Sequence, residues 1–182
     1  MITICSLLFF KNEYKRGGKI PTAHKSDIWY NKNMRVEIDQ SNKIEQTNRT
    51  TAVGLANDIE EWVTITGKEK QRLQKYFRKT NQRKLFMVLT FSTLIYLLLK
   101  KIKWKNYEIY IDREYIGYDQ FIKNKIVELF KNNAREKFDI HKLHIVNIGR
   151  SANAHRVANF SANGKIKSSK IMANEILNLI LK

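Results

Sequence analysis

The sequence has one cysteine, one proline and seven glycines among its 182 residues. The single cysteine, Cys5, excludes an internal disulfide and a cysteine-based zinc site, and it fits a reducing compartment, so we expect a cytoplasmic protein. The scarcity of proline and glycine indicates regular secondary structure without a low-complexity linker. Hydrophobic residues make up 43% of the chain, which is enough for a folded domain with a core.

A long apolar run is also missing. The stretch LFMVLTFSTLIYLLL, residues 85–99, is shorter than the roughly 20 residues that a helix needs to cross a bilayer. We therefore interpret it as a buried central helix and expect no stable membrane association. Attachment to a membrane through residues 85–99 is kept as an alternative.

Acidic residues are few, because 17 Asp and Glu stand against 34 Lys and Arg and leave a net charge of +17. Such a charge favours a polyanionic partner, either nucleic acid or an anionic membrane surface. We prefer nucleic acid, RNA, DNA or a hybrid, because so large a charge repels itself unless something neutralises it. The densest basic segment is a predicted helix face that could bind phosphates or could simply be solvated. Its cations are Lys68, Lys70, Arg72, Lys75, Arg78, Lys79, Arg83 and Lys84.

The first 33 residues differ from the rest of the chain. They show little hydrophobic periodicity and contain the only proline, whereas Met34 opens the alternating stretch MRVEID. We therefore predict one domain over residues 34–182. Residues 1–33 would be a loosely ordered arm or the product of a wrongly assigned translation start.

The order of predicted elements in residues 34–182 is β-β-β-α-β-α-β-α. Short polar turns between the first three strands indicate an antiparallel meander, and helical crossovers make the later strands parallel. The prediction is an α/β fold with a mixed five-stranded sheet and helices on both faces. The strands are predicted at 34–41, 50–57, 61–66, 106–112 and 141–149, and the helices at 68–101, 119–138, 152–162 and 169–182.

Two predicted strands carry an aspartate in the same local pattern, aliphatic-x-Ile-Asp. In the first strand the pattern is VEID, with Asp39, and in the fourth it is IYID, with Asp112 at the end of the strand. Either aspartate could simply begin a turn. If the strands are neighbours, however, the two carboxylates converge, and like charges that close need a cation between them. Carboxylate oxygens are ligands that suit Mg²⁺ or Mn²⁺.

This element order and these aspartates resemble the ribonuclease H-like superfamily, which includes ribonucleases H, integrases and resolvases. The resemblance covers residues 34–182 and implies that Asp39 and Asp112 are metal ligands on adjacent strands. It implies a further ligand near the start of the helix after the fifth strand, where His155 stands. The matching third carboxylate is Glu114 or Glu69, and the latter could instead be a helix N-terminal charge. His155 could likewise be an ordinary polar residue at a helix start.

The resemblance therefore implies a Mg²⁺- or Mn²⁺-dependent nuclease that hydrolyses phosphodiester bonds. Arg150, beside the expected site, could bind the backbone of the scissile strand. Junction-cleaving relatives would imply a dimer. The alternative is a basic nucleic-acid-binding protein of the same fold without catalytic activity.

Overall fold

The computed structural model describes residues 34–149 and 152–182 of the chain. The predicted arm, residues 1–33, and Arg150 lie outside the described residues. The strands are β1 (Met34–Ser41), β2 (Thr51–Asn57), β3 (Glu61–Ile65), β4 (Tyr107–Asp112), β5 (Leu143–Val146) and β6 (Ser169–Lys170). The α-helices are α1 (Gly67–Lys79), α2 (Phe86–Leu99), α3 (Asp119–Leu129), α4 (Asn153–Ala162) and α5 (Ala173–Ile180).

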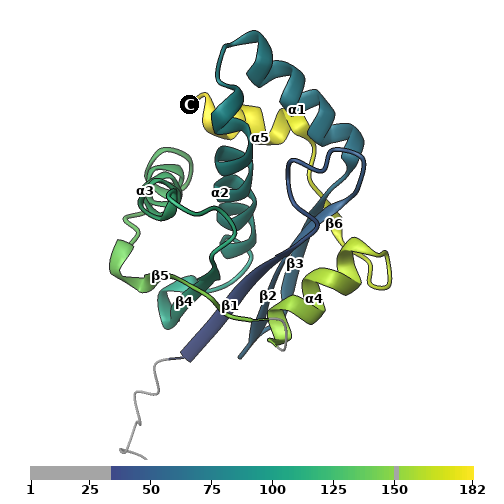
Figure 1. Cartoon of the computed structure of the whole chain (residues 1–182). Helices are drawn as coiled ribbons and strands as arrows, with labels where there is room; N and C mark the ends of the chain where they lie inside the picture. The colour runs from purple at the N-terminus through teal and green to yellow at the C-terminus, as the bar shows by residue number, and fades with distance from the viewer. Residues whose placement is uncertain (1–33, 150–151) are drawn as a thin grey trace, which may run out of the picture. The chain divides into compact units, whose positions relative to one another are not determined.

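Within these residues the strands form one mixed sheet in the order β5-β4-β1-β2-β3-β6 (Figure 1). The first three strands are antiparallel neighbours, as predicted. Strand β4 is parallel to β1, and β5 is parallel to β4. The α/β class and the mixed sheet are therefore confirmed, but the sheet has six strands and not five.

The sixth strand, β6, occupies residues that we predicted as the start of the last helix. Its two residues pair in parallel with Val63 and Thr64 of β3, and the amide of Ile171 continues the pairing by donating to the Thr64 carbonyl at 2.7 Å. A two-residue strand is too short to show an alternating pattern. The helix therefore begins later than predicted, at Ala173.

The predicted continuous helix over residues 68–101 is also wrong, because the chain breaks between α1 and α2. Helix α1 ends at Lys79, and Asn81 has a left-handed φ of 57°. The amide of Gln82 donates to the carbonyl of Phe77 at 2.8 Å, which closes the helix end in the usual left-handed manner. The break lets α1 and α2 point in different directions (Figure 1).

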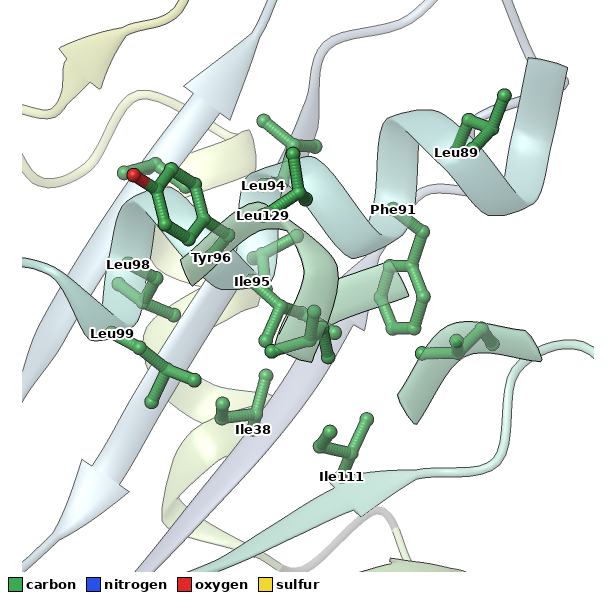
Figure 2. Close-up of a cluster of buried hydrophobic side chains, with 14 of the residues drawn as sticks. Ile38, Leu89, Phe91, Leu94, Ile95, Tyr96, Leu98, Leu99, Ile111 and Leu129 are labelled. Carbon is green, nitrogen blue, oxygen red and sulfur yellow. The ribbon is translucent and has the colours of Figure 1, made fainter. Parts of the chain in front are cut away.

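Helix α2 is the buried central helix that the sequence predicts for residues 85–99. Twelve of its 14 residues are buried, and it packs against α3, α5, β2 and β3. In Figure 2 the side chain of Ile95 points towards Ile38 of β1 and Ile111 of β4. In the described part of the chain, no helix is both long enough and apolar enough to pass through a bilayer.

The other face of the sheet is covered by α4, which packs on β1, β2 and β3. Gly54 of β2 permits a close approach, because a Cβ atom there would lie 2.7 Å from the backbone nitrogen of Ala158. Side chains alternate between the faces of a strand. Val36 and Ile38 therefore join the core under α2, whereas Asp39 points to the face under α4.

Candidate metal centre

Asp39 and Asp112 lie at the same level of two neighbouring parallel strands. Ile38 of β1 is aligned with Ile111 of β4, so the aspartate that follows each isoleucine reaches the same edge of the sheet. Glu114 comes two residues after the end of β4. One carboxylate oxygen from each of these three acids lies within 4.8 Å of the other two. The predicted convergence of Asp39 and Asp112 is confirmed, while their role as metal ligands stays a prediction.

Backbone amides orient both aspartates. Oδ1 of Asp39 accepts a hydrogen bond from the amide of Gln40 at 2.6 Å, and Oδ1 of Asp112 accepts one from the amide of Ile148 at 2.7 Å. Asp39 is only 4% exposed. These bonds fix the aspartates in place and connect Asp112 to the segment that follows β5.

The negative charges of this acidic cluster repel one another. Burial, together with the charges of Asp39 and Asp112, raises the pKa of Glu114 from 4.5 to about 7, while Lys43 acts in the opposite direction. Burial also raises the pKa of Asp39, although the hydrogen bonds from His155 and Gln40 partly offset this effect. A proton on Glu114 is therefore one way to relieve the repulsion. A bound cation is the other.

His155, in the first turns of α4, contacts this cluster directly. Its Nδ1 lies 2.7 Å from Oδ2 of Asp39, and the side chain is 35% exposed. An ionised carboxylate only accepts hydrogen bonds, so Nδ1 carries the proton in this bond whenever Asp39 is ionised. The structure thus places His155 at the predicted site, but with Nδ1 bound to Asp39 and not among the converging ligand atoms.

Glu69 is not part of this cluster. Its Oε1 pairs with Arg72 at 2.8 Å, and its Oε2 accepts a hydrogen bond from the amide of Ala173 at 2.9 Å. The side chain therefore caps the start of α5 and joins that helix to α1. Of the two alternatives for a third carboxylate, only Glu114 lies beside the aspartates.

The predicted basic face of residues 68–84 is exposed, with one exception. Lys70 is fully buried, and its ammonium group donates to the carbonyls of Lys43 and Gln46 and to Oγ1 of Thr51. The prediction that Lys70 binds nucleic acid is therefore wrong. The remaining cations form an exposed basic surface, which consists of Lys68, Arg72, Lys75, Arg78, Lys79, Arg83 and Lys84.

Sequence reasoning missed the support that Tyr115 gives to the cluster. This tyrosine is 7% exposed and packs edge-on against Phe91 of α2. Its hydroxyl lies 3.4 Å from the Gln40 side chain, the Ile44 amide and the Glu45 carboxylate. It thus joins the residue after Glu114 to the loop after Asp39. Its position directly after a candidate ligand was the only signal in the sequence.

Comparison of the chain with protein-family models, with curated proteins and with solved structures gives no match.

Proposed function

We propose that residues 34–182 form a divalent-metal-dependent nuclease of the ribonuclease H-like type, which hydrolyses phosphodiester bonds in nucleic acid. The observation that carries this proposal is the convergence of Asp39, Asp112 and Glu114 within 4.8 Å. Three carboxylates from two adjacent strands and the turn after them form a set of hard oxygen ligands. Such a set suits Mg²⁺ or Mn²⁺.

The strand arrangement supports the ribonuclease H-like assignment. Strands β1, β2 and β3 are antiparallel neighbours, and β4 lies beside β1, so that Asp112 at the end of β4 lies near Asp39 of β1. A helix that begins soon after β5 brings His155 to the same place. The resemblance led us to expect each of these features, apart from the additional strand β6.

A Mg²⁺ or Mn²⁺ ion held here would offset the carboxylate charges, lower the pKa of a water molecule and stabilise negative charge on a scissile phosphate. The residues of the chain would orient these components. The amide of Gln40 and Nδ1 of His155 hold the two oxygens of Asp39 in fixed directions. Glu114 would supply the third carboxylate, and a bound cation would replace the proton that burial and the two aspartates favour on it in the empty site.

The exposed basic surface supports a nucleic acid substrate. Apart from the pair between Arg72 and Glu69, its cations have no ion-pair partner among residues 34–149 and 152–182. Lysine and arginine side chains on a helix can bind backbone phosphates without reading the base sequence. This surface would give the protein affinity for nucleic acid, and the carboxylates would cut it.

The test is a cleavage assay with Mg²⁺ or Mn²⁺ on single- and double-stranded DNA, RNA, an RNA–DNA hybrid and a four-way junction. Wild-type protein should cut at least one substrate, and Asp39→Asn should lose cleavage by at least about 10²-fold while keeping affinity. Asp139→Asn is the matched control, because Asp139 is exposed and caps the turn before β5. It should cut as well as the wild type.

Two results would contradict the proposal. If wild-type protein binds these substrates but cuts none of them with either ion, the chain is a basic nucleic-acid-binding protein, the alternative that the sequence left open. If Asp39→Asn cuts as fast as the wild type, the carboxylate cluster does not carry the activity.

A further inference from the structure

A second candidate site lies at the C-terminal end of α4, on the sheet face that carries Asp39. It is a pocket of about 490 Å³ between α4, the end of β3 and the segment before β6. Five of the residues that line it carry hydroxyl groups, and none of the described residues around it is an aspartate or a glutamate. The polar side chains that line it are Thr50, Thr64, Thr66, Ser161, Ser168, Lys167 and Lys170.

One of these hydroxyls has no partner among residues 34–149 and 152–182. Ser161 is only 3% exposed, and its Oγ makes no hydrogen bond within these ranges. Buried polar groups are nearly always paired, so an orphan hydroxyl that lines a pocket indicates a group supplied by a ligand or by water. The neighbouring hydroxyls of Thr64 and Ser168 lie 2.7 Å apart and bond to each other.

The charges around the pocket favour an anion. Lys167 and Lys170 supply two exposed ammonium groups. The carbonyls at the end of α4 do not oppose them strongly, because those of Phe160 and Ser161 accept hydrogen bonds from the amides of Lys165 and Gly164. Thr66 is the N-cap of helix α1, and because its Oγ1 accepts a hydrogen bond from the amide of Glu69, its hydroxyl hydrogen can still donate to an anion.

We propose that this hydroxyl pocket binds a phosphate group of the nucleic acid backbone and so positions the substrate relative to the carboxylate cluster. This inference rests on the proposed nuclease function for the identity of the ligand, although not for the existence of the pocket. Hydroxyl donors together with lysine ammonium groups match the charged non-bridging oxygens of a phosphate group. A free phosphate monoester has the same chemistry, and the experiment separates the two sources.

The position of the pocket suits this role. Thr64 of β3 pairs with Ala52 of β2, whereas Asp39 of β1 pairs with Gly54. The two sites are therefore two strands and two residues apart, which corresponds to roughly 12 Å from strand geometry. That distance spans a few nucleotides of one strand. A strand held at both points would present the phosphodiester bond at the cluster in one orientation.

The first measurement is binding of inorganic phosphate to the full chain, followed by the amide resonances in NMR spectra at constant ionic strength. Addition of phosphate should shift the amides of Ser161, Gly164 and Ser168 in a saturable way. Ser161→Ala should weaken this binding by about tenfold or more, the effect of one lost hydrogen bond to a charged group. The double variant Lys167→Gln/Lys170→Gln should weaken it about tenfold or more.

The second measurement is the affinity for an oligonucleotide as a function of salt, made in an Asp39→Asn background so that nothing is cut. Lys167→Gln/Lys170→Gln should lower the magnitude of the logarithmic salt slope by about 1 to 2. Lys165→Gln/Lys137→Gln is the matched control, because both lysines are exposed and neither lines the pocket. This control should leave phosphate binding unchanged, and it should change the logarithmic salt slope less than Lys167→Gln/Lys170→Gln does.

Each outcome decides one point. Phosphate binding without any effect of the Lys167 and Lys170 changes on oligonucleotide affinity would overturn the backbone assignment and indicate a site for a free phosphate monoester. If phosphate leaves the amides around Ser161 unshifted, the pocket holds only water and the inference is wrong. If the pocket binds phosphate and the oligonucleotide but wild-type protein never cuts, the nuclease proposal fails and the pocket stands.

Discussion

Replacing Glu114 by Gln should change how the stability of the protein depends on pH. In the folded protein the pKa of Glu114 is raised from 4.5 to about 7, first by burial and then by the charges of Asp39 and Asp112. The folded state therefore holds a proton that the unfolded chain has already lost between these two pH values. Wild-type stability should fall as the pH rises from about 4.5 to about 7 and stay low above that. Glu114→Gln cannot titrate and should lack this component.

The size of the effect follows from the pKa difference. The folded pKa lies about 2.5 pH units above the unfolded one, and each unit corresponds to about 1.4 kcal/mol. The full difference would be about 3.5 kcal/mol. Because Glu114 is only partly buried and solvent screens its interactions, we expect about 1–2 kcal/mol.

The assay is urea unfolding with EDTA present, at pH 5 and at pH 8, for wild-type protein and Glu114→Gln. The free energy of unfolding of the variant minus that of the wild type should increase by about 1–2 kcal/mol from pH 5 to pH 8. Glu175→Gln is the control, because Glu175 is exposed in the first turn of α5. The free energy of unfolding of Glu175→Gln should differ from that of the wild type by nearly the same amount at pH 5 and at pH 8. A difference between wild type and Glu114→Gln that stays the same at both pH values would refute the rise in the pKa of Glu114 that burial and the neighbouring carboxylates cause.

Three further predictions concern the cluster and its supports. With Mg²⁺ or Mn²⁺ at about ten times its dissociation constant, calorimetry should show that the ion stabilises the wild-type protein by about 1.4 kcal/mol. Asp39→Asn should lose this stabilisation. An equal stabilisation of Asp39→Asn would exclude Asp39 as a ligand. Gly54→Ala should lower the free energy of unfolding by about 1–3 kcal/mol in urea titrations, because the new Cβ meets the Ala158 backbone at 2.7 Å; no loss would mean that α4 can shift freely. Lys70→Met should lower the melting temperature and cost about 1–3 kcal/mol, because the Thr51 hydroxyl and two carbonyls lose their donor; an unchanged melting temperature would show that these bonds contribute little.

The sequence was most informative where a local pattern repeats. The motif aliphatic-x-Ile-Asp occurs at Asp39 and Asp112, and strand alternation directs both carboxylates to one face. Parallel pairing of β1 and β4 then brings them together. The buried α2 was equally readable, because its residues are apolar on every side.

Contacts between residues far apart in the sequence could not be predicted from it. Glu69 bonds to the amide of Ala173, 104 residues further along the chain, and no local pattern encodes that contact. The sequence did contain a signal for the buried position of Lys70. It stands three residues before Leu73 and seven residues before Phe77, on the apolar side of α1. Its charge alone suggested a surface position. Asn81, a residue that tolerates a left-handed conformation, marked the end of α1.

The absence of a side chain at Gly54 has a consequence for how variants of this protein should be interpreted. Helix α4 rests there on bare backbone, and His155 stands only three residues before Ala158. Any substitution that lifts the helix would also pull the imidazole away from Asp39. A screen that scores only cleavage would then mistake a packing defect for a defect in the chemistry, so each inactive variant near this crossing needs its own measure of foldedness.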